Sequence, residues 1–185
     1  MQSQIESDEI IEKAPERYDG IDPKVVTKNL GDRNPTVIAE YEAGNGAFSL
    51  KIAKILKNTK VYSCDILDEN IEKMKALSSL ENFIPCQASA LLLKQFVGFT
   101  DLFMFVDNFH TFEDPVSVLN IARRNLYSGK KVLIIDWKKQ ENPMNIPLEK
   151  LRTEWEYMQL LSDCKFAKIR SLALFSDRLF IIAEK

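Results

Sequence analysis

The sequence predicts an α/β protein with a doubly wound, mostly parallel seven-stranded sheet, helices on both faces and an antiparallel C-terminal hairpin. Three observations lead to this prediction. Strand-like and helix-like segments alternate through five strands, as in parallel sheets whose strands are joined by crossover helices. The segment 102–106 is apolar at every position, which is typical of a strand covered on both faces. Two apolar runs close the chain with only Ser176 and Asp177 between them, which predicts a hairpin.

Length, charge and composition set the broad class. The chain has 185 residues, a net charge of −2 and 45% hydrophobic residues, as expected for one globular domain. Residues 1–20 are polar and acidic, so we expect a flexible N-terminal segment before a single domain over 21–185. The charge balance does not indicate nucleic-acid binding, and no apolar run is long enough for membrane insertion. We therefore expect a cytoplasmic protein, and its oligomeric state stays open, a homo-oligomer included.

The expected strands follow from apolar runs bounded by turn residues. They lie at 36–41, 60–64, 83–86, 102–106, 131–137, 166–175 and 178–183. Pro85 lacks a backbone N–H donor, so the strand at 83–86 should lie at an edge of the sheet.

Helices are expected before and between these strands. The first begins at Asp22-Pro23, where the acid can cap the first turn, and ends at Gly31. The others begin near Gly46, Asp68, Leu91, Asp114 and Leu148. We expect the helix at Asp114 to include Leu126, with Gly129 just past its end.

A loop with two glycines joins the first strand to the next helix. It follows the strand residues Ile38-Ala39-Glu40-Tyr41 and reads Glu42-Ala43-Gly44-Asn45-Gly46. Glycine lets a ligand approach the backbone closely, and a helix N-terminus points free N–H groups at the same space. Asp65 ends the next strand about 20 residues later, where an acid can accept hydrogen bonds from the hydroxyls of a ribose. The pattern favours a nucleotide-type ligand site over a simple turn.

Ligands of such sheets bind beyond the carboxyl ends of the strands. The loops after Tyr41, Asp65, Cys86, Val106 and Trp137 should therefore line one rim.

Polar residues follow the apolar strand at 102–106 on that expected rim. His110 is the only histidine of the chain, and it is either a catalytic base or a structural hydrogen-bonding group. Asp107 and Asn108 either contact a ligand or form a turn. Asp136 ends the next long strand, and Lys138 and Lys139 behind it are expected to be surface residues.

Cys64, Cys86 and Cys164 are scattered and odd in number. This spacing indicates neither a disulfide framework nor a metal site. Each cysteine lies in or beside an apolar run, so we expect buried structural thiols.

These segments resemble the class I S-adenosylmethionine-dependent methyltransferases, in particular the small members related to ubiquinone/menaquinone-biosynthesis C-methyltransferases. The family's first motif is two apolar residues, an acid, an apolar residue and then GxGxG. Glu40 stands at the acid, Gly44 and Gly46 at the second and third glycines, and Asp65 at the ribose-binding acid. The stretches 100–115 and 126–139 and the terminal hairpin also match the family's order, so the resemblance covers about residues 17–185.

The resemblance implies a Rossmann-like methyltransferase fold, S-adenosyl-L-methionine as cofactor and a small-molecule acceptor. No cluster of His, Cys or carboxylate residues in the sequence indicates a metal site. His110 and Asp107 are the candidates for a catalytic role. The cofactor-binding residues that the resemblance implies are Glu40, Tyr41, Glu42, Ala43, Gly44, Gly46, Asp65, Ile66, Ala88, Ser89, Asp107 and Asn108.

The first motif is degenerate. Glu42 occupies the position of the family's first glycine, where its side chain could crowd the cofactor or bond its ammonium group. The segment 87–90 has no carboxylate for the adenine amino group, and Ser89 could substitute. One alternative is therefore a catalytically inactive methyltransferase-like binding or assembly protein. A nicotinamide-dependent oxidoreductase fits less well, because Ser49 stands where its third glycine is expected.

Overall fold

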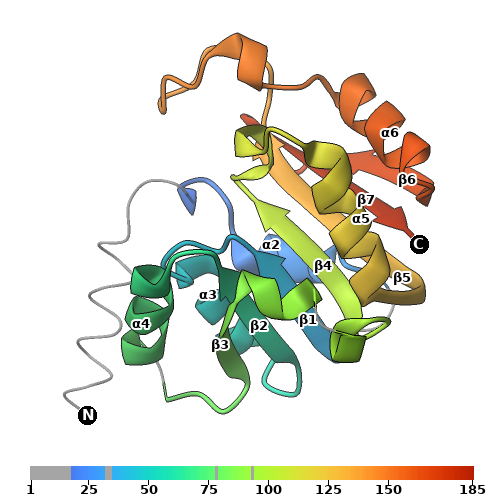
Figure 1. The fold of residues 1–185 in the computed structure, drawn as a ribbon. Helices are drawn as coiled ribbons and strands as arrows, with labels where there is room; N and C mark the ends of the chain where they lie inside the picture. Colours follow the sequence, from blue (N-terminus) through green and yellow to red (C-terminus); the bar gives the residue numbers. More distant parts are fainter. Residues whose placement is uncertain (1–17, 32–34, 78, 93) are drawn as a thin grey trace. The chain divides into compact units, whose positions relative to one another are not determined.

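The computed structural model describes residues 18–31, 35–77, 79–92 and 94–185 (Figure 1). They form two compact units, which divide between Ala90 and Leu91. The predictions for residues 1–17 lie outside the described residues. No helix in the described part of the chain has the length and apolar character needed to cross a membrane.

The first unit contains three parallel strands in the order β3-β2-β1. They are β1 (Val37–Tyr41), β2 (Lys60–Asp65) and β3 (Phe83–Gln87). β3 stands at the end of this order, as the proline within it predicts. The register pairs Tyr41 with Cys64 and Cys64 with Cys86, so the carboxyl ends of the three strands lie side by side.

Three helices belong to the first unit: α2 (Pro23–Lys28), α3 (Ala47–Ile55) and α4 (Asp68–Leu77). α3 contacts β2, and α4 contacts β2 and β3. The Asp22 carboxylate caps α2 as predicted, accepting a hydrogen bond from Lys24 N at 2.8 Å. The helix ends before Gly31, because its C-cap is Asn29, whose side chain also donates to Val25 O at 2.8 Å.

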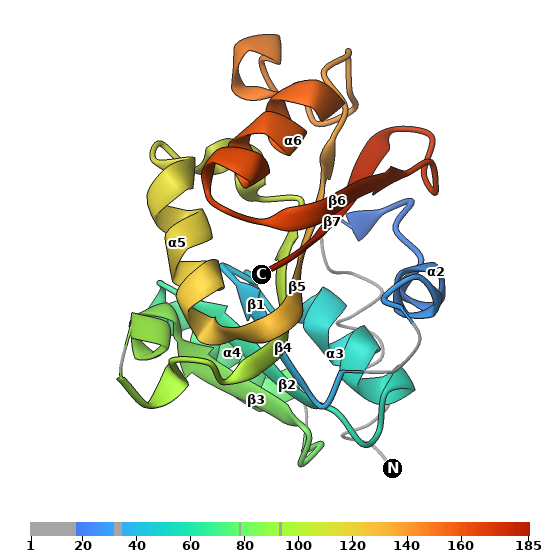
Figure 2. The same ribbon diagram turned by 90° about the vertical axis from the view of Figure 1, so that its right-hand side faces the viewer.

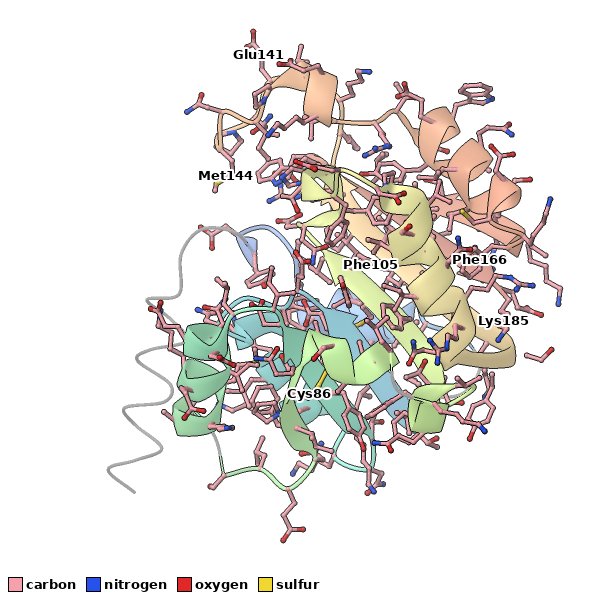
Figure 3. The ribbon with its side chains drawn as sticks, viewed as in Figure 1. Cys86, Phe105, Glu141, Met144, Phe166 and Lys185 are labelled. Carbon is pink, nitrogen blue, oxygen red and sulfur yellow. A yellow bond between two sulfur atoms is a disulfide. The ribbon has the colours of Figure 1, made fainter. Side chains whose placement is uncertain are left out.

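The cysteines differ from the prediction. Cys64 and Cys86 form a disulfide between β2 and β3, seen as the yellow bond near the Cys86 label in Figure 3. They are 22 positions apart in sequence, and the parallel register places them directly opposite each other. Only Cys164 is a buried free thiol among the described residues, as expected. Strand register, which cysteine spacing does not reveal, explains the difference.

The second unit contains the strands β4 (Thr100–Val106), β5 (Leu126–Trp137), β6 (Ala167–Leu172) and β7 (Arg178–Glu184) in the order β4-β5-β7-β6. β4 and β5 are parallel, and β7 is antiparallel to both β5 and β6. The antiparallel pairing was predicted, but the two-residue turn was wrong. β6 pairs only as far as Leu172, because Leu174 N bonds to Leu172 O at 2.9 Å and turns the chain away.

Helix α5 (Pro115–Asn125) contacts β4 and β5, and α6 (Glu154–Asp163) contacts β6 and β7 (Figures 1 and 2). Leu126 was expected in a helix but begins β5, where it pairs with Thr100, and Gly129 lies inside that strand. The expected helix at Leu148 is only a 3-10 turn, η5 (Leu148–Lys150). α6 begins later because Thr153 and Glu156 form a reciprocal capping box.

Two further 3-10 turns, η2 (Ala88–Leu92) and η3 (Lys94–Phe96), take the place of the short helix expected near Leu91, and η4 (Phe109–Thr111) follows β4.

Candidate functional site

The loop after β1 has left-handed backbone at three positions. The φ angles of Glu42, Gly44 and Gly46 are 53°, 61° and 74°. Residues other than glycine rarely adopt this left-handed region, because their Cβ atom meets the backbone there. Glu42 therefore adopts a backbone conformation that suits glycine. The loop keeps its shape with glutamate at this position, at a cost in folding free energy of about 1–2 kcal/mol.

Asp65 connects this loop to the start of α4. Its Oδ2 accepts a hydrogen bond from Gly44 N at 2.7 Å, and its Oδ1 accepts from Leu67 N and Asn70 Nδ2, both at 3.0 Å. A carboxylate has about four acceptor sites, so these three bonds leave Oδ2 with acceptor capacity. The predicted ribose-binding acid thus lies against the glycine loop and can still accept from a ligand hydroxyl.

One side-chain hydrogen bond joins the two elements that flank the loop, and another reaches the loop itself. The Glu40 carboxylate is buried and accepts a hydrogen bond from Ser49 Oγ of α3. The Tyr18 hydroxyl donates to Ala43 O at 3.0 Å. Burial, and then the charge of Glu42, raise the pKa of Tyr41. The structure therefore brings Glu40, Ala43, Gly44 and Asp65 together, as the sequence suggested.

The remaining predicted residues of the first unit surround these strand ends. Ala88 is buried at the start of η2. Ser89 is exposed, and Ile66 follows Asp65 with 57% of its surface exposed.

Asp107, in the second unit, follows β4 with a positive φ of 49°. Its carboxylate is held by Arg178 of β7, through Nε at 2.8 Å and Nη2 at 2.9 Å. Both side chains are fully buried. Asn108, next in sequence, is buried, and its backbone carbonyl accepts from Thr111 Oγ1 at 2.7 Å. Asp107 is therefore part of a structural ion pair, a role that the sequence did not indicate.

His110 lies in η4 and is bound to Asp136 at the end of β5. Its Nδ1 is 2.7 Å from Asp136 Oδ1, and its backbone N donates to Asp136 Oδ2 at 2.7 Å. The His110 side chain is 10% exposed and that of Asp136 is fully buried. A histidine paired with a buried carboxylate is an arrangement suited to proton transfer.

Two residues next to this pair were missed at the sequence level. The buried Tyr157 of α6 donates its hydroxyl to Asp136 Oδ2 at 2.8 Å. Arg152, just before α6, has its guanidinium carbon 5.9 Å from the Phe109 ring centroid. Burial, and then Asp136, raise the pKa of Tyr157 well above 10, while Arg152 acts in the opposite direction. No motif marks these residues, because the tertiary packing of α6 and of the segment before it places them.

Solved structures of methyltransferases resemble this chain. A S-adenosylmethionine-dependent methyltransferase from Aquifex aeolicus matches with a TM-score of 0.81 and 22% identity, over 95% of this chain and 96% of its own. Human N-acetylserotonin methyltransferase, in complex with S-adenosylmethionine, has a TM-score of 0.72 and 19% identity, over 100% of this chain and 57% of its own. The plantazolicin methyltransferase, in complex with S-adenosylhomocysteine, has a TM-score of 0.71 and 14% identity, over 97% of this chain and 89% of its own.

No protein of curated function matches the sequence. The family described as "Methyltransferase domain" matches residues 35–173, which include the glycine loop, Asp65 and the His110–Asp136 pair. The seven strands of the two units have the mixed, mostly parallel arrangement of the Rossmann-like methyltransferase fold. The chain therefore belongs to the class I methyltransferase domain family.

Proposed function

We propose that this protein transfers a methyl group from S-adenosyl-L-methionine to a small-molecule acceptor. The observation that carries the proposal is the Asp65 carboxylate against Gly44 N, in a chain whose family match spans both residues. When bound, S-adenosylmethionine supplies a methyl group on a positively charged sulfur. The protein has to bind it and align the acceptor behind that methyl group.

The residues of the first unit fit such a cofactor. Oδ2 of Asp65 has acceptor capacity for a ribose hydroxyl, and Gly44 and Gly46 leave the backbone open to close approach. Glu42 supplies a carboxylate that suits an ammonium group. Tyr41, Ala43, Ile66, Ala88, Ser89, Asp107 and Asn108 complete the proposed set with Glu40, and His110 is the proposed base.

A catalytically inactive binding or assembly protein is the second candidate. The left-handed Glu42 favours it, because a charged side chain replaces the glycine at the point where the family's loop is open.

Calorimetric titration separates the two candidates. Wild-type protein, Asp65→Asn and the control Asp68→Asn are titrated with S-adenosylmethionine and with S-adenosylhomocysteine. The first proposal expects one-site binding that Asp65→Asn weakens about tenfold to a hundredfold, as for the loss of a hydrogen bond to a charged group. Asp68→Asn should bind like wild type. Folded wild-type protein that binds neither compound at millimolar concentration would exclude the methyltransferase and leave the second candidate.

A further inference from the structure

Four hydrogen bonds converge on the Asp136 carboxylate. Its oxygens lie 2.9 Å from Trp137 N, 2.8 Å from the Tyr157 hydroxyl, and 2.7 Å from both the backbone N and Nδ1 of His110. A carboxylate with this donor set acts as an acceptor only. Nδ1 of His110 must therefore carry a proton, and in the neutral ring the lone pair is on Nε2.

Nε2 of His110 forms no hydrogen bond to any of the residues that the structure describes. The side chain keeps 10% of its surface exposed. Asp136 and Tyr157 thus act as positioning residues, since they hold the ring in one tautomer with its basic nitrogen available. The same logic operates wherever a buried carboxylate orients a histidine base.

Arg152 carries an unused donor near this pair. Its guanidinium interacts with the Tyr157 side chain, but its Nη1 is buried and has no hydrogen-bond partner among the described residues. Its guanidinium approaches the ring of Phe109, the residue before His110. A buried donor without a partner costs about 1–3 kcal/mol, and more when it is charged, so such a group calls for an explanation. An anionic ligand would supply the missing acceptor.

We propose that Arg152 and His110 form an acceptor subsite, and that the acceptor is an acid that also carries a hydroxyl group. This inference rests on the proposed methyltransferase function. Arg152 binds the carboxylate or other anionic group, and Nε2 of His110 takes the hydroxyl proton. The oxygen lone pair forms the new O–CH₃ bond while the S–CH₃ bond breaks. The electron pair of the broken bond stays on the sulfur of the departing S-adenosylhomocysteine. The histidine then returns the proton to water.

The single histidine allows a direct test of the tautomer. In a long-range ¹H–¹⁵N spectrum of the full chain without cofactor, the only imidazole signals belong to His110. We expect the neutral form to carry its proton on Nδ1. An Nε2-protonated neutral ring would overturn the assignment of His110 as a base. The Tyr157→Phe variant should retain the Nδ1 proton, because three donors still reach Asp136.

The same spectrum tests whether the subsite binds an anionic group. 4-Hydroxybenzoate and its neutral analogue 4-hydroxybenzamide serve as probes, and Arg124→Gln, an exposed α5 residue, is the matched control for Arg152→Gln. The acid should shift the His110 signals and bind about tenfold to a hundredfold tighter than the amide, as expected when one charged hydrogen bond separates them. Arg152→Gln should remove this preference, and Arg124→Gln should keep it. Equal binding of acid and amide, no binding of either, or a preference that survives in Arg152→Gln would overturn the subsite.

This test separates the two proposals, because it requires no bound S-adenosylmethionine. If cofactor binding fails while the acid preference holds, the methyltransferase function is wrong and the anion subsite stands. If cofactor binds while the preference is absent, only the subsite is wrong.

Discussion

Arg178 donates two hydrogen bonds to the Asp107 carboxylate, and neither side chain is exposed to solvent. The Arg178 guanidinium also lies over the ring of Trp137, and its Nη1 is 2.7 Å from Asp177 Oδ2. The pair ties the end of β4 to the start of β7, so residues 71 positions apart depend on each other. Removing Asp107 leaves the buried Arg178 charge with Asp177, whose side chain is 35% exposed, in place of its buried bidentate partner. Such a loss is more costly than the pair's net contribution.

Asp107→Asn should therefore destabilise the protein by about 3–5 kcal/mol in urea unfolding. The control is Glu69→Gln, which removes a surface pair with Lys73 whose side chains are 76% and 55% exposed, and it should leave the midpoint nearly unchanged. If Asp107→Asn lowered the free energy of unfolding no more than the control does, the ion pair would contribute little to stability.

Glu42→Gly should stabilise the protein by about 1 kcal/mol, because glycine adopts the φ of 53° without the steric penalty of a side chain. Thermal unfolding measures the change. An unchanged or lower midpoint would mean that interactions of the Glu42 side chain offset its backbone strain.

Gly46→Ala, in the same loop, should have the opposite effect. A Cβ on Gly46 would lie 2.7 Å from Met74 Cγ and 2.9 Å from its Sδ, in a backbone with φ of 74°. Overpacking and strain together should cost about 1–3 kcal/mol in the same unfolding measurement. Wild-type stability would show that Met74 moves aside freely.

Tyr157 should make the folded state sensitive to alkaline pH. Its folded-state pKa is raised by burial and by Asp136, so it stays protonated when the unfolded chain already ionises. Its contribution to stability is complete below pH 10 and is lost as pH rises from 10 toward the higher folded pKa. Unfolding midpoints of wild type should fall over this range, and those of Tyr157→Phe should fall less. Parallel curves would contradict this assignment.

The disulfide between Cys64 and Cys86 should be visible as a thiol count. Denatured without reductant, the chain should react with one equivalent of thiol reagent, at Cys164, and with three after reduction. Cys86→Ser should lose about 2–4 kcal/mol of stability, given the 22-residue separation. Three reactive thiols before reduction would show that the bond does not form.

Local patterns in the sequence were enough to predict the order of the strands along the chain, the cap at Asp22, the edge position of β3 and the glycine loop between β1 and α3. These features depend on apolar periodicity, proline geometry and glycine conformation, which neighbouring residues decide. Where two local signals competed, prediction failed: Leu126 continues a helical apolar pattern, yet pairing with Thr100 makes it the first residue of β5.

By itself, the sequence determined the class of fold and the glycine loop, because both arise from residues close together along the chain. Asp65 was identified by its place in the family's motif order, not by a local pattern. Only the tertiary structure decided which distant side chains meet. The Cys64–Cys86 bond depends on strand register, and Arg178 reaches Asp107 across 71 positions. Tyr157 reaches Asp136 through the packing of α6, and Arg152 reaches the ring of Phe109. Such contacts form because burying apolar surface brings these elements together, and no local pattern encodes which polar groups are then left facing each other.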